Sequence, residues 1–525
     1  YEEIDEKTTK MAGNGYAALG SSHCELKKYI LEEEALQYGV EIKYEAVLTG
    51  VYLNGNRISG IEWFEEATGF HKAFGRIVAD ATADAWVTRT YGGEVRRGRK
   101  SDGKYQPYSN IALFYGNKTT FMYNTDHGYV DPENGEDLST QLIDSAQSEV
   151  FLSDKFNDDL FPLASTLMLG IRSGPGIVGE ETITIDNIFN NNLSDGVYYC
   201  CSNMDNHSKD IAFESEAYKD WCVGASLWGL GVVVPVPLKA MIPRGFDGII
   251  ACGRTISTDY TVSHVVRMKR DVQRSGEIAG LLAYKSIKEN CEIKDVTLDT
   301  EKLDYRFSDT SVTPNRPLSS WLSDIDEIKS ALMSDKPGIG IWSCRYLDDI
   351  DQFLLEWLIS GDCRLSKNSA VALALKGNGS GVEILRKMAK QRDLYTPKTS
   401  RKFNYPHGIT AVYLLGRLKD EESVEIIKEI LLNWTYGETE ECAEFIEGES
   451  DYYFQYLSFG IMALIEIGNQ YEHLRDEISD LLNCLLIRQN KYLPVKMKGS
   501  HNLEYNMYET VINIIKNEFK GEINI

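Results

Sequence analysis

Asp205 and His207 are of the residue types that transfer protons in enzymes, and they are two positions apart. On an extended strand their side chains would point to the same side, and a carboxylate that orients an imidazole is a common acid–base arrangement. A polar pair that only satisfies a loop would have the same spacing. We take both residues as catalytic candidates, with the loop contact as the alternative.

A second polar group lies in a segment with helical spacing. His264 and Arg267 are one helical turn apart and would share a face, with Asp271 one turn beyond. They would bind an anionic substrate or form a solvated charged face. Arg172 and Arg254 are further cations that can hold a phosphate or carboxylate through two hydrogen bonds. His264 and Arg267 are catalytic candidates, and Arg172 is a substrate-binding candidate.

The sequence contains one Gly-x-Gly-x-x-Ala motif, at Gly13, Gly15 and Ala18. A dinucleotide-binding motif needs a buried strand directly before it, because its glycines turn that strand into a helix whose amides hold pyrophosphate. The preceding residues, EEIDEKTTKMA, contain no such strand. We interpret the match as accidental.

The elements around these residues follow from periodicity and turn residues. A helix is predicted over 23–38, ended by Gly39. A meander of short strands follows, with a turn at 54–56 and a last apolar run, 77–82, that ends in small residues. The predicted strands are 40–44, 46–53, 57–63 and 70–79. Small residues at a strand end let another group approach the backbone.

The middle of the chain, from about 101 to 245, is irregular and indicates an inserted cap region. Residues 246–254 then predict a turn, a buried strand and a glycine. The stretch 263–289 is long enough for one or two helices. This strand, glycine and helix return the chain to the core of an α/β domain.

Beyond a linker rich in Ser, Thr, Asp and Pro, the sequence predicts helices in pairs and no strands. The first helices of the pairs each end in glycine, at 368–377, 409–416 and 460–468. The second helices are amphipathic, at 379–390, 422–432 and 473–487. An uneven period of about 40 to 50 residues is typical of HEAT-type repeats. An ordinary helical bundle is the alternative.

Composition excludes several classes of protein. The 525 residues are 43% hydrophobic and 26% charged, as in globular proteins, and allow two to four domains. Lys and Arg number 55 against 79 Asp and Glu, a net charge of −24, so we expect no nucleic acid and no membrane surface as partner. No apolar window reaches the ~20 residues of a membrane span, and no signal peptide is recognisable, so we expect a bacterial-type cytoplasmic protein.

The ten cysteines are scattered, with no CxxC pair and no zinc-type Cys/His spacing. We therefore expect neither a metal site nor a dithiol redox centre, and interpret the thiols as buried apolar side chains.

Three separated segments resemble one family in content and order. Residues 80–107 (DATADAWVTRTYGGEVRRGRKSDGKYQP), 166–207 and 249–283 (IIACGRTISTDYTVSHVVRMKRDVQRSGEIAGLLA) are similar to the three characteristic stretches of the FAD-dependent oxidoreductase family. The resemblance covers about residues 20–290. Some members of this family also carry helical repeats behind the flavin domain.

The resemblance implies an α/β flavin-binding fold, Rossmann-like, that binds FAD through loops at strand ends and through a helix start facing the flavin ring. The cofactor-binding residues that it implies are Asp80, Ala81, Thr82, Asp84, Gly253, Arg254, Ser275, Gly276, Glu277 and Ala279. Glycine permits close backbone approach, and amides at a helix N-terminus stabilise negative charge on a reduced flavin.

The sequence departs from the family pattern at several points. Ala83 replaces a glycine, the run 173–176 (Ser-Gly-Pro-Gly) replaces Glu-Ser-Arg-Arg, and Glu277 replaces a glutamine. The family's first, glycine-rich βαβ unit is absent from this chain. Either the chain is a shortened form, or another polypeptide supplies the unit, or FAD binding has been lost. We expect the chain as given to be flavin-free with an open cleft or completed by another chain.

These observations predict a Rossmann-like flavin-binding domain in 1–100 and 246–304 that lacks its first βαβ unit. They also predict a β-rich substrate cap in 101–245, a linker in 305–325 and an all-α HEAT-like domain in 326–525. The predicted function is hydride transfer between a small organic substrate and FAD. The alternative is a non-catalytic scaffold. A protein partner would bind the helical repeats or complete the FAD site.

Overall fold

The computed structural model describes residues 2–13, 23–116, 118–146, 161–190, 192–299, 321–399, 404–433, 449–496 and 504–524. Its contacts divide the chain into two compact units. We call them the mixed unit (Tyr1–Gly98, Tyr105–Ser202 and Val233–Thr310) and the helical unit (Arg99–Lys104, Asn203–Val232 and Ser311–Ile525). Residues 99–104, at the start of the predicted cap, and residues 203–232, within it, therefore belong to the helical unit.

The mixed unit begins with two packed helices, α1 (Glu2–Ala12) and α2 (Cys24–Gln37). The ring of His23 caps α2 by accepting the Leu26 N–H at 3.3 Å. Gly39, with φ at +73°, follows the last turn. The helix predicted over 23–38 is thus confirmed, because cap residues mark both of its ends.

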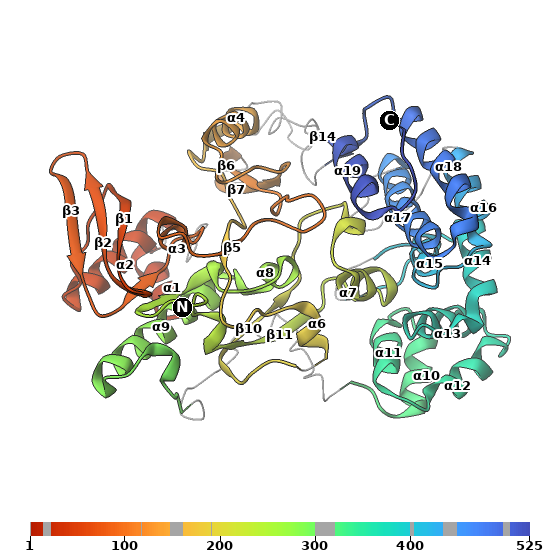
Figure 1. The fold of residues 1–525 in the computed structure, drawn as a ribbon, viewed down its shortest axis with the longest axis horizontal. Helices are drawn as coiled ribbons and strands as arrows, with labels where there is room; N and C mark the ends of the chain where they lie inside the picture. The colour runs from red at the N-terminus through yellow and green to blue at the C-terminus, as the bar shows by residue number, and fades with distance from the viewer. Residues whose placement is uncertain are drawn as a thin grey trace. The chain divides into compact units, whose positions relative to one another are not determined.

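The predicted meander forms an antiparallel sheet in the order β1-β2-β3, with bounds Ala46–Asn54, Arg57–Glu65 and Gly69–Phe74 (Figure 1). Gly55, at φ +65°, makes the predicted turn between β1 and β2. The predicted strand 40–44 is wrong: these residues are mostly exposed, so they have no buried face to pack. The predicted strand 70–79 is broken after Phe74, where Gly75 donates to Ser59 O before the next strand begins.

The two predicted buried strands pair with each other in parallel. They are β4 (Val78–Asp80) and β12 (Ile249–Ala251), and within the described residues they form a two-stranded sheet. Two helices follow β12: α8 (Tyr260–Val266) and α9 (Lys269–Glu289). Met268, with extended backbone, separates them, so the segment 263–289 belongs to two helices.

Short strands and helices lie between Trp86 and Pro237, most of them within the region predicted to be irregular. One sheet has the order β7-β6-β8, and two further pairs are β5 with β9 and β10 with β11. Their bounds are Val95–Arg96 (β5), Ser109–Gly116 (β6), Thr119–Asp126 (β7), Phe161–Ser165 (β8), Gly176–Ile177 (β9), Gly196–Asn203 (β10) and Gly231–Pro237 (β11). The helices are α3 (Trp86–Thr90), α4 (Gly135–Ser145) and α6 (Ile185–Phe189).

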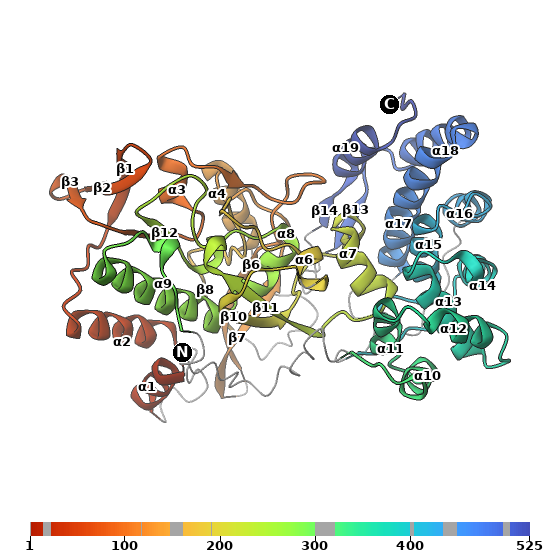
Figure 2. The same ribbon diagram turned by 60° about the horizontal axis from the view of Figure 1, so that its bottom comes forward.

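The helical unit contains a run of helices that succeed one another along it (Figure 2). Their bounds are Ile325–Met333 (α10), Gly338–Ser343 (α11), Ile350–Leu358 (α12), Cys363–Leu375 (α13), Val382–Lys390 (α14), His407–Arg417 (α15), Ser423–Leu432 (α16), Glu449–Gln470 (α17), Arg475–Arg488 (α18) and Tyr508–Glu518 (α19). The six predicted helices correspond to α13 to α18 and are confirmed. Alternate helices contact each other, α13 with α15 and α15 with α17, and likewise α14 with α16 and α16 with α18.

Two expectations about this unit are wrong. Only Gly377, at φ +79°, ends its helix, whereas Gly416 and Gly468 lie inside α15 and α17. A Cβ on Gly416 would lie 2.7 Å from Ala463, so this glycine serves close helix packing. A two-stranded antiparallel sheet of β13 (Pro494–Lys496) and β14 (Glu504–Asn506) also breaks the all-α pattern. Most of the predicted linker lies outside the described residues.

The segment Asn203–Val232 is fastened to the helices by a buried carboxylate. It contains α7 (Glu216–Lys219) and a π-helical turn over Asp220–Gly224. Asp220, 2% exposed, accepts from Arg345 at 2.9 Å, from Tyr413 at 2.6 Å and from Arg417 at 3.1 Å.

Among the helices in the described ranges, none combines the length and apolarity needed to cross a bilayer.

Candidate functional site

Asp80, at the carboxyl end of β4, organises the turn that follows the strand. One carboxylate oxygen accepts hydrogen bonds from the N–H and the hydroxyl of Thr82, at 3.2 and 2.6 Å. The other accepts from the N–H and the hydroxyl of Thr88, both at 3.1 Å. The Thr82 hydroxyl in turn accepts from the Trp86 N–H at 2.7 Å. Asp80 is fully buried, so its carboxylate holds the turn and leaves Ala81 exposed on it.

Gly253 occupies the equivalent place after β12. Its φ of +80° is a left-handed conformation that favours glycine. A Cβ at this position would meet only Val272, at 3.8 Å, so described residues leave that side of the backbone open. The Gly253 N–H donates to Ser275 Oγ at 2.9 Å. This loop therefore offers open backbone beside the carboxyl ends of two parallel strands.

Arg254 connects the two loops to a third segment. Its Nε donates to Ala83 O at 2.8 Å, and one Nη donates to Ile171 O. Asp84, whose carboxylate pairs with Arg89 at 2.7 Å, lies on the same turn. Burial lowers the pKa of Arg254 while Asp84 opposes that shift. Arg254 thus connects the two loops through hydrogen bonds to backbone carbonyls. Its contact with an anion stays a prediction.

The residues predicted at a helix start lie elsewhere on that helix. Since α9 begins at Lys269, Ser275, Gly276, Glu277 and Ala279 lie in its second and third turns. The expectation that they form the helix N-terminus is therefore wrong, because the break at Met268 begins a new helix earlier. Ser275 and Ala279 are buried, whereas Gly276 and Glu277 are exposed.

The break also separates the second polar group. His264, on α8, is fully buried with its ring edge-on to Tyr260 at 4.8 Å. Arg267 caps α8, and Asp271 belongs to α9, so the three residues do not share one helical face. The alternative of a solvated charged face is wrong for His264, because tertiary packing covers it.

Arg172, the substrate-binding candidate, is nearly buried in the mixed unit. Its two Nη atoms donate to Pro107 O and to the Asp126 carboxylate, each at 2.6 Å. Both contacts hold the segment around Arg172 against β7 and the residues before β6. A role in binding substrate stays a prediction.

Asp205 and His207 do meet, although not on a strand. β10 ends at Asn203, and His207 has a positive φ of +55° in the loop beyond it. The His207 Nε2 atom lies 2.6 Å from an Asp205 carboxylate oxygen, with both side chains about one-fifth exposed (21% and 23%). The predicted pairing is thus confirmed and the predicted extended strand is wrong. Both residues belong to the helical unit, whereas the Asp80 and Gly253 loops belong to the mixed unit.

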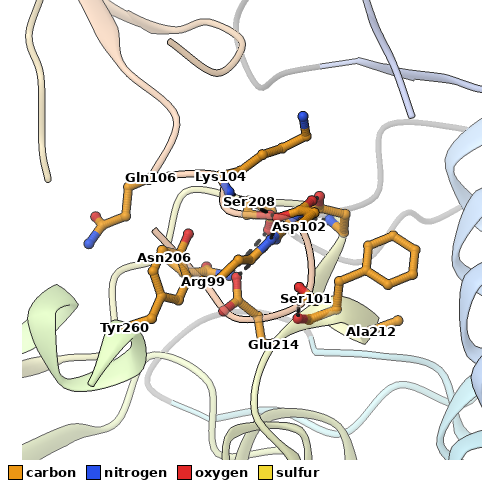
Figure 3. Close-up of polar contacts among 12 residues, drawn as sticks. Arg99, Ser101, Asp102, Lys104, Gln106, Asn206, Ser208, Ala212, Glu214 and Tyr260 are labelled. Atoms are coloured by element: carbon orange, nitrogen blue, oxygen red, sulfur yellow. Dashed lines mark hydrogen bonds and ion pairs between the residues drawn. The ribbon is translucent and has the colours of Figure 1, made fainter. Parts of the chain in front are cut away.

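Sequence reasoning missed a buried cluster of charges in the helical unit, around Arg99 (Figure 3). Arg99 pairs with Asp102 at 2.7 Å, with Asp210 at 2.6 Å and with Glu214 at 3.4 Å, and Ser208 donates to Asp210. None of these four charged side chains is more than 4% exposed. Arg99 and Asp210 are 111 positions apart, so no local spacing could indicate the cluster.

Because three carboxyl groups surround one guanidinium, the pKa values of the carboxyl groups in this cluster are shifted. Burial and the nearby Asp210 and Asp102 raise the pKa of Glu214 to about 8, against the attraction of Arg99. Burial raises the pKa of Asp102, but the effect of Arg99 is larger and holds this pKa below its ordinary value. Glu214 therefore carries a proton near neutral pH.

The glycine motif near the N-terminus follows a helix. Residues 2–12 form α1, so no buried strand precedes Gly13, as expected, and Gly13 ends that helix at φ +56°. Gly15 and Ala18 lie outside the described residues.

Comparisons with known proteins test the family resemblance that the sequence indicated. No curated protein and no solved structure matches the chain. The sequence model of the family described as FAD dependent oxidoreductase matches residues 2–150 and 125–305, which together span more than half of the chain. The chain belongs to the FAD-dependent oxidoreductase family.

Proposed function

We propose that this protein transfers hydride between a small organic substrate and FAD. The observation that carries the proposal is the pair of loops at the carboxyl ends of β4 and β12, one held by Asp80 and the other opening at Gly253. Ligands of α/β folds bind outside the carboxyl ends of parallel strands. Membership of the FAD-dependent oxidoreductase family supports FAD as the ligand that we propose for these loops.

The residues at the loops fit such a group. The open side of Gly253 admits a close backbone approach that a side chain would block, and Ala81 and Gly276 are exposed small residues from the implied set. Bound FAD would supply the hydride chemistry. Asp80 and Arg254 would hold the loops in place through the hydrogen bonds described above.

Removal of a hydride from a hydroxyl or amine carbon is accompanied by loss of a proton, and Asp205 and His207 remain the candidate acid–base pair of the chain, with their role a prediction. The Asp205 carboxylate at Nε2 orients the ring and fixes its tautomer, which is the arrangement of a general acid or base. The left-handed backbone of His207 indicates a position held by its surroundings.

The contacts between alternate helices support a HEAT-like arrangement of the helical unit. They also favour the second candidate function, a non-catalytic scaffold that binds a protein partner through these helices. The two candidates differ in one measurable property, because only the oxidoreductase must bind FAD.

The test is titration of the full chain with FAD, followed by fluorescence, in the wild type and in two glycine variants. Gly253→Ala and Gly245→Ala are matched, since both glycines have positive φ (+80° and +79°) and neither Cβ would clash with described residues. We expect Gly253→Ala to weaken FAD binding at least tenfold and Gly245→Ala to leave it unchanged. Absence of FAD binding in the wild type would contradict the proposed function for this chain by itself, and equal affinity of both variants would remove Gly253 from the site.

A further inference from the structure

The backbone amide of Gly253 is held from inside the mixed unit by two side chains. Its N–H donates to Ser275 Oγ at 2.9 Å, and Ser275, on α9, is 1% exposed. The phenol of Tyr198 on β10, which is 1% exposed, lies beside the Ser275 side chain and interacts with it. Side chains of β10 and α9 thus lie together behind the backbone of the loop, and Ser275 is bonded to it.

The meeting of Tyr198 and Ser275 depends on how β10 is fastened to α9. Arg270, in the first turn of α9, donates to Cys201 O at 2.6 Å. The Asp271 carboxylate also lies beside the Cys201 backbone and interacts with it. These two contacts fix the position of α9 along β10, so that its next turn brings Ser275 to Tyr198.

The chemistry of the two hydroxyls suits a fixed contact. A serine hydroxyl has one proton and two lone pairs, so Ser275 can accept from Gly253 and also bond to Tyr198. Burial, followed by the effect of Cys200, raises the pKa of Tyr198 well above its ordinary value, so the phenol stays neutral. The contact is therefore insensitive to pH in the physiological range.

We propose that Tyr198 and Ser275 are positioning residues that hold the Gly253 loop in the conformation in which it receives FAD. The inference rests on the proposed function. It assigns Ser275 a role different from that implied by the family resemblance, because its hydroxyl is buried and bonded to the loop. Tyr198 enters the site as a residue that no sequence motif indicated.

The first test compares the full chain with Ser275→Ala and Ser286→Ala. Ser286 is a matched control, since it lies on the same helix, is 3% exposed and donates to Cys291 O. We expect Ser275→Ala to raise the Kd for FAD about tenfold, the factor typical of one lost hydrogen bond, and Ser286→Ala to leave it unchanged. Unchanged affinity in Ser275→Ala, or equal weakening in both variants, would overturn the proposal.

The second test asks whether Tyr198 acts through Ser275. We expect Tyr198→Phe alone to weaken FAD binding about threefold, and to have no further effect when Ser275→Ala is already present. Additive effects of the two substitutions would contradict the relay.

The third measurement needs no cofactor. Hydrogen exchange of the Gly253 amide, followed by mass spectrometry of the peptide around it, should be at least tenfold faster in Ser275→Ala and unchanged in Ser286→Ala. If the wild type bound no FAD, the proposed function would fail while this exchange still decided the positioning role. Unchanged exchange in Ser275→Ala would disprove it.

Discussion

At the scale of single residues, the buried polar groups serve different ends in the two units. In the mixed unit, Asp80 and Arg254 satisfy backbone groups of the loops that follow two strands. In the helical unit, Arg99 forms ion pairs with the buried carboxylates of Asp102 and Asp210. Such a cluster is costly to break, because removal of one partner leaves buried charge unpaired.

The proton on Glu214 predicts a particular dependence of stability on pH. Its pKa is about 8 in the folded chain and 4.5 in a free side chain, so the folded state binds more protons between these values. Its stabilising contribution is complete below about pH 4.5 and is lost as the pH rises to about 8, by ~1.4 kcal/mol per pH unit at most. Glu214→Gln removes this titration.

We therefore expect the free energy of unfolding of Glu214→Gln, relative to the wild type, to increase from pH 5 to pH 8 and to level off above. Urea unfolding followed by circular dichroism at each pH measures it. The difference cancels most other titrating groups, which are common to both chains. A difference independent of pH would show that Glu214 is ionised in the folded protein at neutral pH.

At the scale of elements, the ends of helices carry information that the apolar pattern lacks. Gly377 ends α13 as predicted, but α15 ends with Lys419 in the left-handed conformation, at φ +53°. Gly416, which the sequence indicated as the cap, lies within the helix against Ala463. A glycine near a helix end thus serves either the backbone turn or the packing, and only the neighbours decide which.

Lys419→Gly should stabilise the chain by about 0.5–1 kcal/mol, because glycine adopts a positive φ without steric cost. Lys387→Gly is the opposite control, since Lys387 is exposed within α14, and we expect it to destabilise by a similar amount. Midpoints of urea unfolding measure both. Loss of stability in Lys419→Gly would mean that the lysine side chain contributes more than its backbone costs.

Asp220, like the carboxylates around Arg99, is a buried charge that holds separate elements together through ion pairs. Asp220→Ala leaves Arg345 and Arg417 without their buried partner, and we expect a loss of about 3 kcal/mol in the free energy of unfolding. Glu216→Ala is the control: it also removes a partner of Arg417, at 2.6 Å, but Glu216 is mostly exposed and should cost less than about 1 kcal/mol. Equal losses in the two variants would contradict the importance of burial.

At the scale of the whole molecule, the helical unit is assembled from three separate stretches of chain. The stretch Asn203–Val232 brings Trp221 and Cys222 into its core, and Thr410 on α15 donates to Val223 O at 3.0 Å. A Cβ on Gly338 would lie 2.4 Å from Ala225 O, so backbones approach closely there. The helices alone are therefore an incomplete unit.

Residues 321–525 expressed as a fragment should unfold at a lower urea concentration than the same helices in the intact chain. A fragment that also carries 203–232, joined by a flexible linker, should recover part of the difference, because the added stretch covers apolar surface. Far-ultraviolet circular dichroism measures both. Identical midpoints for the two fragments would show that 203–232 adds nothing to the unit.

Local signals in the sequence were enough to predict several elements. The helix ending before Gly39, the hairpin around Gly55 and the six helices α13 to α18 follow from caps, turns and periodicity within a few residues. The resemblance of three segments was likewise enough to indicate the family, which the comparison confirmed. Such signals need no knowledge of which distant residues meet.

Tertiary structure decided what depends on long separations. It placed Arg99 against Asp210, Arg254 against Ala83, and Ser275 against Gly253, pairs that are 111, 171 and 22 positions apart. Asp205 and His207 also contact each other, but within the loop after β10 and not on a strand. Hydrogen bonds between distant residues leave no periodic trace in the sequence, because their geometry is set by packing of whole elements and not by the spacing of their members.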